Sequence, residues 1–429
     1  MSEPVLPSIL IQNGRVIDPS QSMDELTSLL IGDGRVVCYG ASPNGQDIVI
    51  DATDKIVAPG LIDMHVELRE PGLEEDETIA SGTLAALAGG YTSVACVPTT
   101  DPPIDTQAGV EFVHHQAMLV DHCNVFVLAC VSKNRDGKEL AEIGSLVKAG
   151  AVGFSDADRP IHDPELLRRA LEYCLMFDKP VLSHPEVLEL TRDGIMHEGL
   201  LSMILGLGGF PTVAEDMMTS RDLRMAEATG GRLHIMNVSS AESVELIRLA
   251  KLRDITVTAE VCPYHLFLTD EKLRSFDSNF KVNPPLRDQR CVDACIEGLL
   301  DGTLDVIASG HAPRAAEKKM QELDQAPFGM IGLETTLGVV ATQLVQPGHL
   351  DWSTALRKMT INPSRVLGLD KGTLQVGADA DVTIIDPAAK WTVSNASLFS
   401  KSRNTPLIGT ELCGRADTVI VGGRVKYPR

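Results

Sequence analysis

Two patterns of hydrophobic and polar positions alternate along the middle of the chain. Short runs that are apolar almost throughout are separated by longer stretches with helical features. Residues 240–254 are one such stretch, because they start with Ser, carry Glu early and end with Lys and Arg, as the helix dipole favours; residues 78–90 are another. Fully apolar runs are typical of strands in a parallel sheet covered on both faces. We predict such strands at residues 60–66, 92–98, 124–131, 151–156, 180–185, 232–238, 256–263 and 305–312.

This alternation predicts an α/β fold, a (β/α)8 TIM barrel. A doubly wound parallel sheet is the alternative, but it more often shows a Gly-rich phosphate loop after its first strand, and the sequence has none there. We therefore expect a barrel over residues 59–369.

The two ends of the chain have a different pattern, in which short predicted strands are separated by turn signals. Asn13-Gly14 and Asp33-Gly34 are hairpin signals in the first segment, and residues 370–429 repeat its style. We expect residues 1–58 and 370–429 to build one small composite β-sandwich.

Composition narrows the classes of partner. The chain has 429 residues, 44% hydrophobic and 4% aromatic, with a formal net charge of −21. This charge argues against a nucleic acid, which needs Lys and Arg to displace phosphate counterions, and against an anionic membrane surface. The longest apolar stretches are too short and too Gly-interrupted to span a bilayer.

Cysteine usage and the amino terminus indicate the compartment. The nine cysteines are odd in number and form no CxxC pair, so we expect reduced thiols. The first ten residues show no basic segment followed by an apolar one, as a secretion signal requires. We therefore expect a cytoplasmic protein.

Polar side chains gather where the predicted strands end, which is where barrel enzymes place their chemistry. The first strand ends in "HVELR", the fourth in "FSDAD" and the eighth in "SGHAPR". The candidate residues at these and the neighbouring strand ends are His65, Glu67, Arg69, Asp156, Ala157, His184, Asn237, Gly310 and Arg314.

The chain resembles the type I dihydroorotases of the amidohydrolase superfamily almost from end to end. The resemblance rests on the ordered motifs "LREPG", "AGGYTSVACVP", "GIMHEG", "KVNPPLR", "PFGMIGLET", "INPSRVLGL", "GADADVTIIDP" and "SRNTP". It implies a barrel of the metal-dependent hydrolase type, one or two zinc ions, and a place in pyrimidine biosynthesis. Active relatives interconvert carbamoyl aspartate and dihydroorotate.

The resemblance assigns metal ligands residue by residue. His65 and His184 stand where the family has ligand histidines, but Glu67 replaces the second histidine of the first strand. The family's bridging Asp aligns with Ala157, or with Asp156 after a slip of one residue.

Replacements at two further family positions predict a loss of catalytic activity. Asn237 replaces the histidine of the sixth strand, and Gly310 replaces the Asp that serves as ligand and general base. The last histidine of the family's "DHAPH" motif is Arg314. An amide is a poor ligand for a transition metal, and glycine has no side chain. Removing a general base alone costs roughly 10²–10⁴ in rate.

Positions that the family uses for substrate are partly kept. Arg69 aligns with the carboxylate-binding Arg and Asn283 with the Asn of "NPPLR", whereas Thr99 replaces an Asn. Arg69 has an alternative role, pairing with Glu67 or Glu70.

These substitutions favour a non-catalytic homologue that binds no metal. The resemblance to degenerate family members implies a structural partnership with aspartate transcarbamoylase, in a homo- or hetero-oligomer. An active cyclic amidohydrolase is the first alternative, with one zinc held by His65, Glu67 and His184 and with His311 as base. A binder of small molecules that uses Arg69 and Asn283 without turnover is the second.

Overall fold

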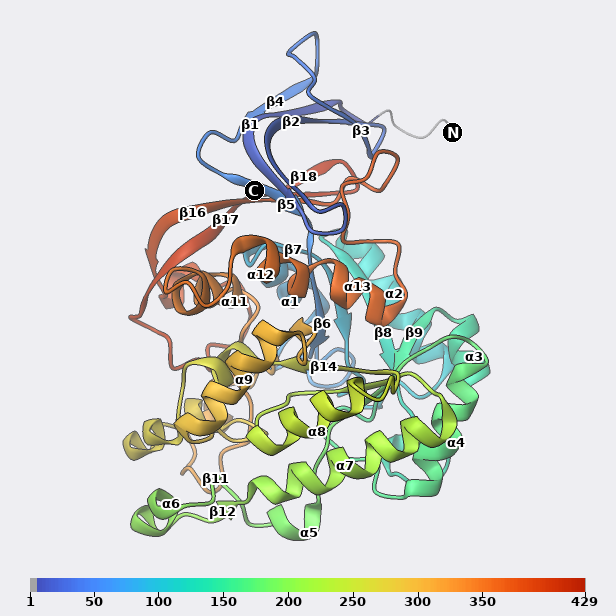
Figure 1. The fold of residues 1–429 in the computed structure, drawn as a ribbon, viewed down its shortest axis with the longest axis vertical. Helices are drawn as coiled ribbons and strands as arrows, with labels where there is room; N and C mark the ends of the chain where they lie inside the picture. The colour runs from blue at the N-terminus through green and yellow to red at the C-terminus, as the bar shows by residue number, and fades with distance from the viewer. Residues whose placement is uncertain (1–5, 429) are drawn as a thin grey trace.

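A computed structural model describes residues 6–428 of the chain. Its central element is an eight-stranded parallel sheet in the order β15-β14-β13-β10-β9-β8-β7-β6, seen in the middle of Figure 1. The strands are β6 (Leu61–Val66), β7 (Tyr91–Cys96), β8 (Asn124–Ala129), β9 (Ala151–Phe154), β10 (Val181–Ser183), β13 (Leu233–Ile235), β14 (Val257–Val261) and β15 (Val306–Ile307).

The sheet closes on itself. A parallel bridge joins Val66 to His311, and the Glu67 amide donates to the His311 carbonyl at 2.9 Å. The predicted (β/α)8 barrel is confirmed, and each predicted strand exists. Several strands end earlier than predicted. The polar residues that follow them leave the ladder and lie at the end of the barrel formed by the carboxyl ends of the strands.

Helices alternate with the strands and cover the barrel. They are α1 (Ile79–Ala88), α2 (Gln107–Val120), α3 (Ile143–Lys148), α4 (Pro164–Leu175), α5 (Leu188–Thr191), α6 (Leu200–Leu205), α7 (Thr212–Thr229), α8 (Ala241–Lys251), α9 (Gln289–Asp301), α10 (Ala316–Lys319), α11 (Thr336–Val340), α12 (Trp352–Met359) and α13 (Ile361–Leu367). Ser240 caps α8, as the sequence predicts, and Thr78 caps α1.

Short helical turns complete the connections: η1 (Lys133–Arg135), η2 (Pro263–Leu266), η3 (Asp270–Ser275), η4 (Ser278–Phe280), η5 (Ala341–Val345) and η6 (Asn395–Ser397). Among residues 6–428, no helix is long and apolar enough to cross a bilayer.

The barrel interior is packed with apolar side chains rather than open. Met64, Ala95, Leu128, Val152 and Leu182 come from the successive strands β6 to β10 and belong to one buried cluster. Strand residues that point outward pack against the helices in a second, larger cluster. These two layers explain why the strands are apolar on both faces, and they leave only the strand ends for polar chemistry.

Both chain ends join one continuous sheet, order β18-β17-β16-β5-β1-β2-β3 with β4 paired to β1. It curls above the barrel in Figure 1. Its strands are β1 (Ile9–Asp18), β2 (Met23–Gly32), β3 (Arg35–Tyr39), β4 (Ile48–Asp51), β5 (Ile56–Pro59), β16 (Val382–Thr392), β17 (Glu411–Val421) and β18 (Arg424–Tyr427). The domain boundaries drawn from the sequence stay a prediction.

One turn prediction in this sheet is right and one is wrong. Asp33-Gly34 makes the hairpin between β2 and β3. Asn13-Gly14 lies inside β1, at a register shift against β2. A Cβ on Gly14 would lie 2.5 Å from Val57 Cγ2, so this glycine allows β5 to approach β1 closely.

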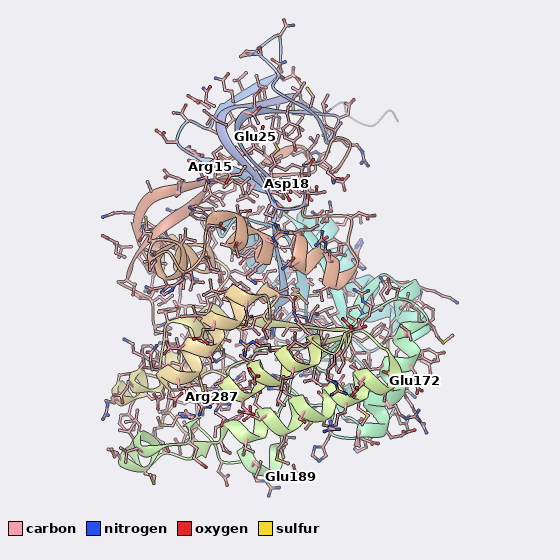
Figure 2. All side chains as sticks on the ribbon, viewed as in Figure 1. Arg15, Asp18, Glu25, Glu172, Glu189 and Arg287 are labelled. Carbon is pink, nitrogen blue, oxygen red and sulfur yellow. The ribbon has the colours of Figure 1, made fainter. Side chains whose placement is uncertain are left out.

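An excursion after β10 carries α5, α6 and the short strands β11 (Met196–His197) and β12 (Gly209–Phe210). The buried Arg287, labelled in Figure 2, anchors it. Its guanidinium donates to the Phe210 carbonyl at 2.8 Å and to Ser239 Oγ at 3.0 Å, and it pairs with Glu215 at 3.3 Å. The excursion therefore has a fixed position against the barrel.

Candidate functional site

A cavity of about 360 Å³ opens at the carboxyl ends of the barrel strands. Its wall brings together candidate residues from several strands, as barrel enzymes require. The polar side chains that line it are His65, Glu67, Asp158, His184, Glu186, Asn237, Tyr264, Asn283 and Arg314; Gly310 and the segment 327–329 complete the wall.

His65 is oriented by a buried carboxylate. Its Nδ1 lies 2.6 Å from Glu260 Oε1, and the other oxygen of Glu260 lies 3.2 Å from His234 Nε2. Burial acts to raise the pKa of Glu260, but His65 and His234 outweigh it and hold that pKa at about 2. Burial likewise acts to lower the pKa of His65, and the Glu260 carboxylate raises it above its ordinary value. His234 is structural, since Thr258 and Glu260 occupy both ring nitrogens.

Glu67 forms ion pairs with two guanidinium groups. Arg69 pairs with it directly, and Arg314 Nη1 lies 3.6 Å from Glu67 Oε2. Burial raises the pKa of Glu67 despite the Arg69 charge. Of the two roles that the sequence allows for Arg69, the structure has the ion pair with Glu67. The carboxylate is thus engaged by cations of the chain itself.

His184 also has a carboxylate partner, which the sequence analysis missed. Its Nε2 lies 3.2 Å from Glu186 Oε2, and Asn283 donates to the same oxygen at 3.0 Å. Thr191 bonds the other oxygen of Glu186. Burial acts to raise the pKa of Glu186, but these partners hold it at about 2. The signal was available, because Glu186 follows His184 at the two-residue period of an extended chain.

Other side chains fill the space beside Gly310, the residue that aligns with the family's general base. Gly310 has φ +58°, and a Cβ there would lie 2.5 Å from Cys262 Sγ and 2.7 Å from Tyr264 Oη. Cys262 in turn donates to Asn237 Oδ1 at 3.0 Å. Burial raises the pKa of the Cys262 thiol, which fits an inert rather than a nucleophilic cysteine. The space that a carboxylate would need is occupied.

The fourth-strand segment turns a different residue toward the cavity from the ones expected. Asp156 accepts from the amides of Val131 and Ser132 at 2.9 and 3.1 Å, so its carboxylate holds a neighbouring loop. Ala157 is buried and has no polar side chain. Asp158 lines the cavity instead and pairs with Arg135.

His311 and Thr99 do not join the polar wall. The His311 ring lies between Glu77, 3.5 Å away, and the Gly332 amide, which donates to Nδ1 at 3.2 Å. His311 is fully buried outside the lining, so it has no access to a water in the cavity. Thr99 is buried behind Arg69, which donates to the Thr99 carbonyl at 3.3 Å.

The arrangement does not fit a metal ion. Among residues 6–428, no group of three or more His, Cys, Asp or Glu side chains is placed to hold one. His65 presents Nε2, but Glu67 is paired with arginines and His184 with Glu186. A ligand set of His65, Glu67 and His184 requires the pairs of Glu67 with both arginines to break, whereas His184 keeps Nδ1 without a hydrogen-bond partner among the described residues.

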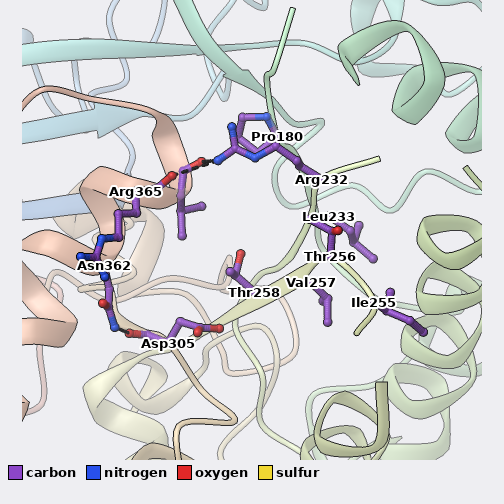
Figure 3. A pocket seen from close by; sticks show the side chains of 11 residues that line it. Pro180, Arg232, Leu233, Ile255, Thr256, Val257, Thr258, Asp305, Asn362 and Arg365 are labelled. Atoms are coloured by element: carbon purple, nitrogen blue, oxygen red, sulfur yellow. Dashed lines mark hydrogen bonds between the residues drawn. The ribbon is translucent and has the colours of Figure 1, made fainter. Parts of the chain in front are cut away.

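A second cavity, of about 370 Å³, lies at the opposite, amino-terminal end of the strands. Figure 3 shows Arg232 reaching the backbone of α13, with bonds of 2.9 and 2.7 Å to the carbonyls of Arg365 and Val366, and Asn362 bonded to the Asp305 carbonyl. These donors are used on backbone carbonyls. This cavity therefore joins α13 to the barrel rather than assembling reactive groups.

The chain is similar to known proteins over nearly its whole length. A family model described as "Dihydro-orotase-like" matches residues 54–243, and one described as "Amidohydrolase family" matches residues 330–427. A dihydroorotase of Pelotomaculum thermopropionicum is 50% identical over 97% of this chain and 98% of its own. A dihydroorotase of Pelobacter propionicus is 48% identical over 98% of this chain and 100% of its own.

Solved structures share the fold. The L-hydantoinase (dihydropyrimidinase) from Arthrobacter aurescens matches with a TM-score of 0.87 and 24% identity over 98% of this chain and 96% of that one. The dihydropyrimidinase from Brevibacillus agri matches with a TM-score of 0.84 and 24% identity over 97% of this chain and 94% of that one.

Proposed function

The chain belongs to the type I dihydroorotase family. From this premise we propose that it serves pyrimidine biosynthesis as a non-catalytic homologue. In this role it is a cytoplasmic structural partner of aspartate transcarbamoylase, within a hetero-oligomer. The barrel and the terminal sheet supply the surface for the partner, while the cavity no longer carries a reaction.

Gly310 is the observation that carries this proposal. Opening a cyclic amide needs a Lewis acid on the carbonyl, an activated water and a group that moves the proton to the leaving nitrogen. The residue at the family's base position has no side chain, and Cys262 and Tyr264 stand where a carboxylate would go. His311, the nearest replacement along the chain, is buried outside the cavity.

The charges around Glu67 support the same conclusion. Two guanidinium groups already balance its buried carboxylate. A metal ion placed there would face the positive charges of Arg69 and Arg314 at close range, and like charges in a buried site repel strongly. The cavity is stable as a set of internal ion pairs without an added cation.

An active cyclic amidohydrolase with one zinc ion is the second candidate. It is favoured by the relatives, which are named dihydroorotases at identities of 50% and 48% over nearly the full chain. His65 also suits a metal ligand, because a carboxylate on Nδ1 orients the ring and leaves Nε2 for the ion. This function requires Glu67 to exchange its arginine partners for zinc, whereas His184 can keep Glu186 on Nε2 and offer Nδ1.

Binding of a small molecule without turnover is a third candidate. Within the described residues, the buried atoms without a hydrogen bond include Asn283 Oδ1 and His184 Nδ1 of the cavity wall and Thr99 Oγ1 behind Arg69. Buried polar atoms are normally satisfied, so a bound polar ligand would remove a cost of about 1–3 kcal/mol each.

Calorimetric titration of the metal-free full chain with zinc tests the main proposal. The expected result is no stoichiometric binding, and the variant His65→Ala together with His184→Ala gives the same trace as the wild type. One zinc per chain, lost in that double variant, overturns the proposal in favour of the second candidate.

The partnership has its own test. Sedimentation velocity of the chain mixed with the aspartate transcarbamoylase from the same genome should give one boundary that moves faster than either protein. Two boundaries at the positions of the separate proteins overturn the structural role.

A further inference from the structure

Helix α6 presents an uncovered apolar stripe. Leu200, Met203 and Ile204 are 72%, 73% and 61% exposed, and their spacing puts them on one face of the helix. Leu201 is buried on the other side, in an apolar cluster that also contains Tyr264 and Val282 of the cavity wall. Figure 1 shows α6 at the end of the molecule opposite the terminal sheet.

A groove of about 480 Å³ runs beside this stripe, between α6, η3 and the start of α9. Leu200, Leu201 and Ile204 line its apolar side. The opposite side is polar and carries Asp270, Glu271 and Asp288. The groove is thus amphipathic across its width, as a site for an amphipathic segment must be.

The polar side of the groove accepts hydrogen bonds and attracts positive charge. Its one arginine, Arg274, is bonded to Glu271 at 2.5 Å, so no groove residue supplies a cation to Asp288, which also caps α9, or to Asp270, which is 8% exposed. His197 Nδ1 is buried in the wall and makes no hydrogen bond within residues 6–428. Burial and the Arg287 charge lower the pKa of His197, which favours the neutral ring.

We propose that the groove between α6 and η3 docks a basic amphipathic segment of a partner protein. The apolar residues of that segment cover the α6 stripe, and its Lys or Arg side chains reach Asp270 and Asp288. The inference rests on the partner role proposed above and assigns a surface to it. A second copy of the chain is the wrong occupant, because it carries the same acidic groove and the same net charge of −21.

Peptide binding to the full chain tests this surface. The probes are two fluorescent helical peptides of matched length, one built from Leu and Lys and one from Leu and Glu, and the readout is anisotropy. The test variant carries Leu200→Ser and Ile204→Ser. The matched control is Leu252→Ser, an exposed leucine (76%) at the end of α8, far from the groove.

The Leu–Lys peptide should bind the wild type at least tenfold more tightly than the Leu–Glu peptide. The double variant should weaken it by about 10- to 100-fold, since two large apolar side chains lose their cover, while Leu252→Ser leaves it unchanged. Equal binding of both peptides, or equal weakening by test and control variants, overturns the proposal. Self-association of the wild type that the double variant abolishes assigns the groove to a second copy and overturns it as well.

The outcome is separable from that of the proposed function. If aspartate transcarbamoylase co-sediments equally with the wild type and the double variant, the partner role stands and this surface is wrong. If the wild type fails to co-sediment but the peptides bind as expected, the surface stands and the named partner is wrong.

Discussion

Restoring the family's carboxylate at position 310 should destabilise the protein rather than activate it. In the variant Gly310→Asp the new Cβ meets Cys262 Sγ at 2.5 Å and Tyr264 Oη at 2.7 Å. Cys262 is fully buried and bonded to Asn237, and Tyr264 is 7% exposed at the cavity wall, so the new Cβ requires both side chains to shift. The position also has φ +58°, where side chains other than glycine are strained.

The size of the destabilisation follows from two contributions, the backbone strain and the crowding of the new side chain. A left-handed backbone costs roughly 1–2 kcal/mol for a residue with a Cβ. Forcing extra atoms into a packed site costs about 1–3 kcal/mol. The expected loss of stability is therefore about 2–5 kcal/mol, before any cost of burying the carboxylate.

Thermal unfolding measures this loss against a matched control. Gly368→Asp places the same residue at φ +65° where no atom lies within 4 Å of the new Cβ, so it reports the backbone cost together with the unfavourable charge of a carboxylate at the C-terminus of α13. Gly310→Asp should lower Tm clearly further than Gly368→Asp, and adding Cys262→Ala should recover part of the difference. Equal Tm values for the two aspartate variants would refute the packing argument.

Three further predictions concern the rest of the structure. Arg287→Met should cost about 3–5 kcal/mol, because it leaves the buried Glu215 carboxylate unpaired, whereas exposed Arg290→Met should not change Tm. Burial and the Lys281 charge lower the pKa of Lys319 to about 7; the neutral amine therefore contributes stability that is lost as pH falls from about 10 to about 7. The free energy of unfolding, measured at a series of pH values, should show this slope in the wild type and a flatter one in Lys319→Met. Chelation of metal ions should leave Tm unchanged, and a drop on chelation would reveal a structural metal.

The barrel could be predicted because its signal is local. Each strand is a short apolar run, and the residues needed to recognise β6 or β14 are contiguous. The Asn13-Gly14 error has the opposite origin. The dipeptide has turn chemistry, but the reason for its glycine is the approach of Val57 from a strand far along the chain.

The candidate site also divides into residues that can be located from local sequence and contacts that depend on distant parts of the chain. His65, Glu67 and His184 lie in the cavity wall as predicted, since strand ends can be located from the sequence. The partner of His65 and the second partner of Glu67 could not be found, because Glu260 and Arg314 come from distant segments of the chain. Arg69 and Glu186, by contrast, lie only two residues from the side chains with which they pair. The selection of Asp158 over Asp156 depends on which carboxylate the neighbouring loop engages, and periodicity carries no information on that.

Turnover is the most direct test of the central claim, that the chain keeps the dihydroorotase fold without the reaction. The measurement is the rate of dihydroorotate ring opening by the purified full chain, with excess zinc and after chelation. We predict a rate equal to that of buffer in both conditions. A zinc-dependent rate that proceeds through many turnovers and disappears in His65→Ala and His184→Ala would contradict the account.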